Sequence, residues 1–448
     1  MSEWKKVKID FDTIKLGDFI EPIKTTVLEL GEKNPIVYGV TNKEGIVQTG
    51  KPASKDISNY IALEDDCFAF NPYRVNVGSI GINDKKLKGC VSPAYVVFRT
   101  KNGLLPKFLY FYLKSDYGIH LINWYGNRGG VRNALRYSDL CNIDIPNINH
   151  LDQQKILKKF LSASDKIDEI SKEIESQKNY IKQLRQNILQ DAIEGKLTTD
   201  WHKQNPVQKG NPDYDAEALF EQIQKERNSE KKQKELSPIT DEEKPFEIPE
   251  GWKWVRLGSI VENITSGSRE WAKYYSDKGA IFLRMGNLSR DSYKLRLEKL
   301  QYVCVPETTE GKRTRLVPFD LLFSITAEIG NLGLIPENFP EAYINQHTAR
   351  IRFVDSIKQS LFFANSLLAP AIRKQYMPNA HGMKNSFRLD TLSYLIVPLP
   401  PLAEQKEIVA LVEKHLHTVS VLENQIAERE EMTKQLMQSI LKDAFEEI

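Results

Sequence analysis

Two long stretches of the chain carry apolar residues at alternating steps of four and three. The first covers residues 153–194, and the second runs from residue 405 to residue 448. This spacing places the apolar residues in one a/d seam along a helix and is typical of a coiled coil. At about 1.5 Å per residue, each helix would be roughly 60–65 Å long, which few globular domains need. The seam positions of the first stretch are Ile156, Phe160, Ala163, Ile167, Ile170, Ile174, Gln177, Ile181, Leu184 and Ile188.

The second stretch repeats the first at an offset of 252 residues and without a gap. Ile156 thus corresponds to Ile408, and the polar seam residue Gln177 corresponds to Arg429. Between residues 130–196 and 382–448, 17 of 67 aligned positions are identical. A repeat of this length predicts an internal duplication. A polar a/d position typically sets the register of a helix pair, and we interpret Gln177 and Arg429 in this way.

Short strand-like runs, separated by Gly, Asn, Asp and Pro, precede each long stretch. In the first half they cover residues 36–40, 67–70 and 95–98, and in the second half residues 280–283, 302–305, 321–325 and 349–353. Apolar residues at helical spacing then predict one helix over residues 105–123 and a corresponding helix over residues 357–374. Trp4, Trp252, Trp254 and the two Leu-Gly pairs at 16–17 and 257–258 are assigned to domain cores.

The pattern therefore predicts an α/β fold with two globular domains, residues 1–150 and residues 250–401. Two long helices follow them, over residues 151–196 and 402–448, and Gly195 is placed where a glycine would end the first helix. Residues 197–249 are predicted to be a polar linker with one short helix at 216–235. Leu219, Phe220 and Ile223 could give that helix a face that docks on a domain.

Charge is unevenly distributed although the net charge is only +2. Residues 1–149 carry +4 and residues 250–401 carry +6, whereas the remaining residues carry −8. A mildly basic domain favours a polyanionic partner through counterion release. The four cysteines have no paired spacing, and the chain has no signal region or long apolar run, so we expect a cytoplasmic protein with reduced thiols.

No catalytic motif is present. The sequence lacks a phosphate-binding G-x-x-x-x-G-K-[ST] loop and a dinucleotide-binding G-x-G-x-x-G after a strand. Asn71-Pro72-Tyr73-Arg74 resembles the Asn-Pro-Pro-Tyr element of amino-methyltransferases but lacks its second proline and any cofactor loop. The histidines do not cluster, so no metal site is expected. We therefore expect a chain that is not an enzyme by itself.

Polar and basic loops of both domains are the candidate DNA-binding surface. Arg suits guanine and Asn or Gln suits adenine in the major groove, whereas Lys, Ser and Thr suit phosphates. For any single residue, ordinary loop surface is the more common explanation. Arg132 and Lys384 occupy equivalent positions of equivalent loops, which raises their weight. The predicted DNA-binding residues are Tyr38, Thr41, Asn42, Lys43, Asn76, Ser79, Arg128, Arg132, Arg269, Trp271, Lys273, Tyr274, Arg284, Asn287, Gln346, His347 and Lys384.

Residues 398–405 read Pro-Leu-Pro-Pro-Leu-Ala-Glu-Gln at the start of the second long helix. This run resembles the distal conserved region of the DNA-specificity subunits of type I restriction–modification enzymes. Residues 146–153 resemble the central conserved region more loosely, since they keep only the proline, an acid and the glutamine. Residues 189–197 and the Ile-Pro-Glu-Gly-Trp run at 248–252 fit the same family. The resemblance covers the whole chain and follows the order of the family's parts.

The resemblance implies that each globular half is a target recognition domain that reads one half of a bipartite DNA sequence. It also implies that the two long helices pack antiparallel as a coiled coil and set the spacing between the half-sites. Two methyltransferase subunits and restriction/translocase subunits are the implied partners. S-adenosylmethionine, ATP and Mg²⁺ would belong to those partners, so no cofactor is expected in this chain.

Three other functions stay open at the level of the sequence. The chain could be a coiled-coil adaptor whose ends bind proteins, and a steep fall of DNA affinity with salt would oppose that. It could be the recognition subunit of a related system that only methylates. A free-standing methyltransferase is the weakest alternative, which S-adenosylmethionine binding by the isolated chain would revive.

Overall fold

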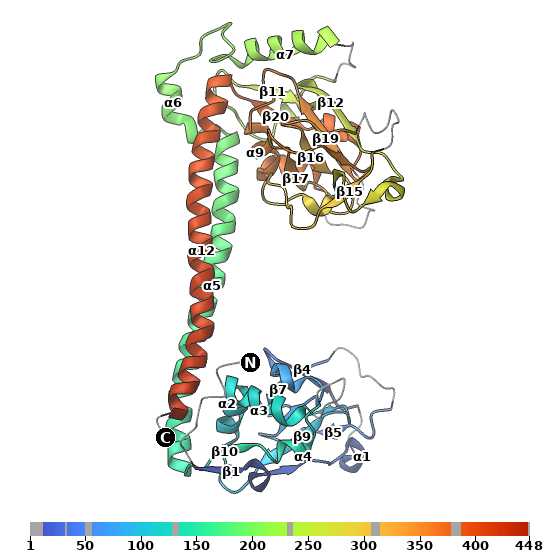
Figure 1. The fold of residues 1–448 in the computed structure, drawn as a ribbon. Coiled ribbons are helices and arrows are strands. Elements are labelled where there is room, and N and C mark those ends of the chain that lie inside the picture. The colour runs from blue at the N-terminus through green and yellow to red at the C-terminus, as the bar shows by residue number, and fades with distance from the viewer. Residues whose placement is uncertain are drawn as a thin grey trace. The chain divides into compact units, whose positions relative to one another are not determined.

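The computed structural model describes residues 12–31, 34–49, 56–127, 134–230, 236–305, 314–377 and 387–446. The chain divides into two compact units. The first consists of Met1–Ser176 with Ile426–Ile448, and the second consists of Gln177–Gln425. The two long helices α5 (His150–Ile193) and α12 (Leu402–Glu446) each contribute to both units (Figure 1).

The described part of the first unit contains three small sheets. One pairs β1 with β10, and the other two have the strand orders β2-β9-β6-β7 and β4-β3-β8-β5. The pairing is antiparallel except between β3 and β8, which run parallel. The strands are β1 (Thr13–Lys15), β2 (Ile20–Pro22), β3 (Val37–Thr41), β4 (Gly45–Gln48), β5 (Ile61–Ala62), β6 (Phe68–Phe70), β7 (Ile80–Ile82), β8 (Cys90–Val91), β9 (Val96–Thr100) and β10 (Asp144–Pro146).

Helices cover one face of the β2-β9-β6-β7 sheet and bury its aromatic side chains, whereas Ala69 and Val97 on its other face belong to a core cluster with residues of the β4-β3-β8-β5 sheet. Phe68 and Phe98 stack with ring centroids 4.7 Å apart and belong to one core cluster with Phe108 of α2 and Phe160 of α5. Burial of a side chain of this size stabilises the fold by about 1.5–3 kcal/mol. The helices of this unit, before α5, are α1 (Val27–Leu30), α2 (Pro106–Lys114), α3 (Asp116–Gly126) and α4 (Tyr137–Leu140).

The second unit repeats this plan. It pairs β11 with β20, and its larger sheets have the orders β12-β19-β16-β17 and β13-β15-β14-β18, with β14 and β18 parallel. Its strands are β11 (Lys253–Arg256), β12 (Val261–Ser266), β13 (Tyr275–Ser276), β14 (Ala280–Leu283), β15 (Gln301–Val303), β16 (Leu321–Ser324), β17 (Leu332–Leu334), β18 (Ala342–Ile344), β19 (Thr348–Phe353) and β20 (Ile396–Leu399). Its helices are α6 (Thr199–Gln204), α7 (Ala216–Glu230), α9 (Phe362–Leu368), α10 (Pro370–Tyr376) and α11 (Leu389–Ser393).

The matching orders β2-β9-β6-β7 and β12-β19-β16-β17 extend the duplication to the middle of each domain, where the sequence shows little identity. The other four-stranded sheets differ, because the strand added to the shared three is β5 beside β8 in the first unit and β13 beside β15 in the second. The Leu-Gly pairs at residues 16–17 and 257–258 make one close packing contact that both domains have. A Cβ at Gly17 would lie 2.8 Å from Cβ of Cys141, and a Cβ at Gly258 would lie 2.8 Å from Cβ of Ser393. Cys141 and Ser393 are themselves equivalent positions, so both copies need glycine at the same close approach. Leu16 and its counterpart are fully buried, as predicted.

The predicted seam of the long helices is confirmed for one of its two positions per heptad. Ile174 and Ile181 of α5, and Val412 and Val419 of α12, are less than 10% exposed. At the other position Leu184, Leu422 and Leu436 are 42%, 38% and 45% exposed. In the second unit, Arg185 of α5 pairs with Glu423 of α12 at 3.1 Å. Thr198, just after α5, bonds to Glu404 at the start of α12, so the two helices run antiparallel there. In the first unit, Ile440 of α12 packs against the core cluster that holds the start of α5.

Gly195 follows α5 with φ +71°, a left-handed conformation that suits glycine, so the predicted helix end is confirmed. The prediction of one continuous helix before each long helix is wrong. Ser115 separates α2 from α3 because its backbone is extended and its hydroxyl accepts from the backbone N–H of Gly118, which starts a new helix. In the second unit, Pro370 at the first position of α10 produces the equivalent break after α9.

Candidate nucleic-acid interface

A tight hairpin turn presents three of the predicted residues in the first unit. Thr41 ends β3, and β4 begins at Gly45, whose φ of +67° closes the turn. The backbone N–H of Glu44 donates to the Thr41 hydroxyl oxygen at 3.1 Å. Thr41, Asn42 and Lys43 are all exposed. The turn can therefore offer a hydroxyl, an amide and an ammonium group to a partner.

A second loop, residues 71–79, lies against this hairpin. Its 3₁₀ turn ends at Gly78, whose φ is +81°. Asn76 is half-buried, and its backbone carbonyl accepts from the Asn123 side chain of α3 at 3.3 Å. Lys114, at the end of α2, donates to backbone oxygens of both Asn42 and Gly78 and so joins the two loops. Sequence reasoning missed Lys114, because nothing in a helical apolar run signals such a contact.

Two large exposed aromatic side chains were also missed in the first unit. Trp124 of α3 is 69% exposed, and Tyr73 is 63% exposed. Trp124 directly follows Asn123, and Tyr73 lies in the same loop as Asn76. Exposed aromatic residues of this kind could have been flagged only by knowing which face of α3 is buried. Tyr73 adds an aromatic ring that could stack on a partner to the same loop as Asn76, and Trp124 adds another on α3.

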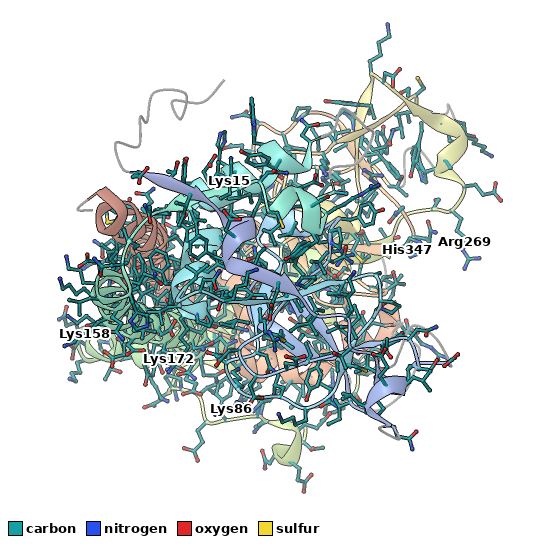
Figure 2. The ribbon with its side chains drawn as sticks, turned by 90° about the horizontal axis from the view of Figure 1, so that it is seen from below. Lys15, Lys86, Lys158, Lys172, Arg269 and His347 are labelled. Atoms are coloured by element: carbon teal, nitrogen blue, oxygen red, sulfur yellow. The ribbon has the colours of Figure 1, made fainter. Side chains whose placement is uncertain are left out.

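In the second unit, the structure brings Ser268 beside the segment that contains Gln346 and His347. Ser268 forms an isolated parallel bridge with Asn345, and the backbone N–H of Gly267 donates to the Asn345 carbonyl at 3.1 Å. A Cβ at Gly267 would lie 2.0 Å from the Ile344 carbonyl oxygen, so only glycine permits this approach. Arg269 and His347, both labelled in Figure 2, therefore belong to neighbouring segments. Arg269 is exposed and His347 is half-buried.

His347 is held in one orientation by two side chains. The amide nitrogen of Gln346 lies 2.8 Å from Nε2, and the Thr326 hydroxyl lies 2.9 Å from Nδ1. An amide NH₂ can only donate, so Nε2 accepts and Nδ1 carries the proton that it donates to Thr326. The amide oxygen of Gln346 then remains as an acceptor for a partner. Thr326 is a positioning residue that the sequence did not reveal.

The remaining loop cations of the second unit have mixed roles. Lys273 lies 5.2 Å from the centre of the Tyr274 ring and 3.4 Å from a carboxylate oxygen of Glu270. The Tyr274 side chain and the Glu270 carboxylate raise the pKa of this exposed lysine, which stays charged. Arg284 is half-buried, next to a 3₁₀ turn. Both cations, with Tyr274, stay candidates for phosphate or base contacts.

Four predicted residues are buried and support the loops instead of facing a partner. Trp271 is 5% exposed and packs on Phe282 and Tyr343, with ring centroids 5.0 and 5.5 Å away. Asn287 is 3% exposed and donates to two backbone carbonyls, which fixes its turn. Tyr38 lies in a core cluster, and Ser79, at the end of the loop at residues 71–79, is 7% exposed. Burial is a tertiary property that residue type and loop position do not show, and it supports a structural role for these four residues. Arg128, Arg132 and Lys384 lie outside the described residues.

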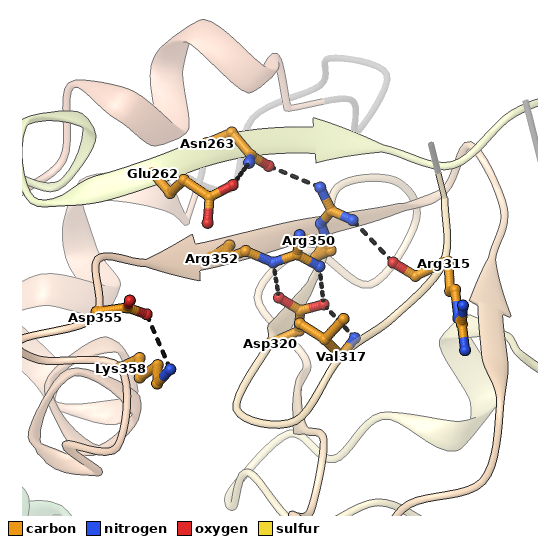
Figure 3. A network of polar contacts seen from close by, with 9 residues as sticks. All are labelled: Glu262, Asn263, Arg315, Val317, Asp320, Arg350, Arg352, Asp355 and Lys358. Atoms are coloured by element: carbon orange, nitrogen blue, oxygen red, sulfur yellow. Dashed lines mark hydrogen bonds and ion pairs between the residues drawn. The ribbon is translucent and has the colours of Figure 1, made fainter. Parts of the chain in front are cut away.

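Several cations of the second unit are used internally (Figure 3). Arg352 of β19 binds the buried Asp320 carboxylate with two bonds of 2.7 and 2.8 Å. Burial opposes the charge of Arg352, but the bonds to Asp320 prevail and raise its pKa. Arg350, two residues earlier on the same face, donates to Asn263 and to the Arg315 carbonyl. These two arginines hold the sheet together, so net charge overstates the cations free for DNA.

The motif at residues 398–405 places a carboxylate in a buried polar cluster. Glu404 is 1% exposed and accepts from Thr198 and from the Trp252 indole N–H, both at 2.7 Å. Nε2 of His202 lies 2.6 Å from the same carboxylate. The cluster ties the start of α12 to the segment after α5 and to the start of the second domain. In the first copy the equivalent acid, Asp152, is exposed and bonds to Lys155.

The described residues contain no group of three or more His, Cys, Asp or Glu side chains that could hold a metal ion. All four cysteines are free, and burial raises the pKa of Cys67 to about 12, which makes it a poor nucleophile. None of the described helices has the length and apolar character that crossing a membrane requires. The candidate residues of the loops offer hydrogen-bonding groups and charges.

Comparisons with known proteins agree with this description. The family model of the type I restriction modification DNA specificity domain matches residues 8–178 and 249–431. The specificity subunit of the type I restriction enzyme EcoAI from Escherichia coli is 29% identical over 53% of this chain. The EcoKI specificity subunit of Escherichia coli strain K12 is 23% identical over 97% of this chain and 85% of that protein. The chain spans only 40% of the EcoAI subunit and 14% of the EcoEI subunit.

Two solved structures share the fold. A chain from work on complex assembly and conformational transition of the type I R-M system has a TM-score of 0.66 and 19% identity, with 97% of both chains covered. The HsdS subunit from Thermoanaerobacter tengcongensis has a TM-score of 0.51 and 18% identity, with 97% of this chain and 96% of that chain covered. The curated relatives are named specificity subunits, which agrees with the prediction of a recognition subunit rather than an enzyme. This chain therefore belongs to the family of type I restriction modification DNA specificity domains, and it contains two copies of the family's domain.

Proposed function

We propose that this chain is the DNA-specificity subunit of a type I restriction–modification complex and reads a bipartite target. The observation that carries the proposal is the duplication itself. One four-stranded sheet has the same order in both domains, β2-β9-β6-β7 and β12-β19-β16-β17, and a glycine makes the same close approach in both. Their loops carry different candidate contact residues. Two domains with a common fold and different loops are suited to binding two different DNA sequences.

Each domain supplies its own set of polar groups for one half-site. In the first, these are the exposed residues 41–43 with Asn76, and in the second they are Arg269, Lys273 and the Gln346–His347 pair. The ammonium groups would bind backbone phosphates, and the amides and the guanidinium would hydrogen-bond to base edges. Methyl transfer and DNA cleavage would be the work of two methyltransferase subunits and of restriction subunits, which would bring S-adenosylmethionine, ATP and Mg²⁺. The family likeness and the long helices support these partners.

Methylation mapping tests the proposal. The chain is co-expressed with the methyltransferase encoded beside it, and N6-methyladenine is located on plasmid DNA by long-read sequencing. The expected result is one bipartite motif that disappears when this chain is omitted. The control is the methyltransferase alone at the same expression level. Methylation that does not change when the chain is omitted, together with no DNA binding at low salt, would favour a protein-binding adaptor.

A further inference from the structure

The Lys114 ammonium makes three hydrogen bonds within the protein. Its ammonium donates to the Asn42 carbonyl at 2.7 Å, to the Asn42 side-chain oxygen at 2.8 Å and to the Gly78 carbonyl at 3.0 Å. An ammonium has three protons, so these bonds use all of them. Burial lowers the pKa of Lys114, which means that the charge is held at a cost in solvation. The three hydrogen bonds to oxygens of the two loops offset this cost.

The contact fixes the orientation of the Asn42 side-chain amide. Lysine only donates, so the amide oxygen must face Lys114 and the NH₂ group must point away. Glycine at position 78 leaves room for this oxygen, since a Cβ there would lie 2.8 Å from it, and the φ of +81° itself favours glycine. Asn42 is exposed, and its NH₂ group has no hydrogen-bond partner in the described part of the chain.

The chemistry of an outward NH₂ group selects its partner. It can only donate, and the acceptors on base edges in the major groove are purine N7, guanine O6 and thymine O4. A free asparagine could turn either end of its amide toward a base and would accept several base pairs. An asparagine locked by Lys114 presents a donor alone, beside the Lys43 ammonium that suits a phosphate.

We propose that Lys114 is a positioning residue that fixes Asn42 with its NH₂ group outward, so that the hairpin turn at residues 41–43 reads a hydrogen-bond acceptor on one base pair of one half-site. This inference rests on the proposed function of the chain. Lys114 does not touch the DNA itself, because all its protons are used within the protein.

The two half-sites of the target supply an internal control for the test. The Lys114→Met chain is co-expressed with its methyltransferase, and methylation is mapped over a library in which every position of both half-sites varies. The matched control is Lys107→Met, which lies on the same helix but pairs at 3.2 Å with Asp84 on the surface. Lys114→Met is expected to lose roughly tenfold discrimination at one base pair of one half-site. The other half-site and the control variant should keep the wild-type preference.

A second variant keeps the test decisive if Lys114→Met folds poorly. Asn42→Asp retains an oxygen for Lys114 but replaces the outward NH₂ group with an acceptor. It should shift the preferred base at that position toward one with a donor, adenine N6 or cytosine N4. Unchanged preferences in Asn42→Asp, or an equal loss at both half-sites in Lys114→Met, would overturn the positioning role. Absence of any bipartite motif with the wild-type chain would instead refute the proposed function.

Discussion

Glu404 is the residue whose surroundings carry the clearest consequence for pH. Its carboxylate is buried among the Thr198 hydroxyl, the Trp252 indole and the His202 ring. Burial raises the pKa of Glu404 above its ordinary value of 4.5, and the hydrogen-bond donors and His202 oppose the shift only in part. A raised pKa means that the folded state prefers the protonated acid. The stability contributed by this preference is present below pH 4.5 and is lost as pH rises through the folded pKa.

Glu404→Gln should remove this dependence, because an amide does not titrate. The melting temperature of the wild type minus that of the variant is therefore expected to fall as pH increases from about 4 to 8. Calorimetry at several pH values measures the difference.

Asp152→Asn, at the equivalent position of the first copy, is the matched control. Lys155 and Asn149 lower the pKa of Asp152, so its contribution is present above the unfolded pKa and lost as pH falls. Its difference should have the opposite slope and be small, since solvent screens this exposed group. Equal slopes in the two variants would contradict the role of burial at Glu404.

The predicted contact residues show what sequence can say about a site. Loop position, residue type and the basic excess indicated Thr41, Asn42, Lys43 and Arg269, all of which are exposed. The same criteria selected Trp271, which is buried, because a Trp between Arg and Lys has no local mark of burial. Lys114 and Thr326 act through neighbours more than 20 residues away, so no local pattern could reveal them.

Among the elements, α7 shows how the linker segment is held. Of the predicted docking face, Leu219 and Ile223 are fully buried and Phe220 is partly buried, and Ala216 is fully buried as well. Arg227 completes the contact, because its guanidinium donates to the backbone carbonyls of Val261 and Gly258 at 3.0 and 2.8 Å. Burial lowers the pKa of this arginine. The helix is thus a part of the second unit and not a free spacer (Figure 1).

Arg227→Met should loosen α7, since the substitution leaves two backbone carbonyls without their donor. The expected cost is about 1–3 kcal/mol for the docking of the helix. Hydrogen exchange of the amides in α7 should become faster, and limited proteolysis should cut the linker sooner. Lys225→Met is the control, because this exposed lysine lies on the same helix. Identical exchange rates in the two variants would show that the apolar face alone holds α7.

The sequence predicted the type of the main helices and strands better than it predicted where a helix breaks or which strands pair. The seam at steps of four and three predicted both long helices to within a few residues, because periodicity of this length is a strong signal. The break at Ser115 was missed, since Ser is common inside helices and caps one only when its backbone is extended. The parallel pairing of β14 with β18 joins segments about 60 residues apart, and local patterns do not encode such pairs.

At the scale of the whole molecule, duplication and the long helices belong together. Both copies end in a helix of nearly equal length, His150–Ile193 and Leu402–Glu446, and both helices bury one apolar position per heptad, as Ile174 and Val419 show. Two recognition domains on a common pair of helices would give a target with two half-sites and a spacer of fixed length. Spacer length would then be a property of the helices, and half-site sequence a property of the loops.

Insertion of one heptad in each long helix separates these two properties. A heptad beside Arg185 in α5 and a matching heptad beside Glu423 in α12 preserve the seam, because the repeat has seven residues. The helix pair would lengthen by about 10 Å, which corresponds to roughly three base pairs of duplex. Methylation mapping should then return the same two half-sites with a spacer longer by about that number. A two-residue insertion in both helices, which turns the seam by about 200° and exposes it, should abolish methylation. Altered half-site sequences in the heptad variant would show that the helices do not simply set the distance between two independent readers.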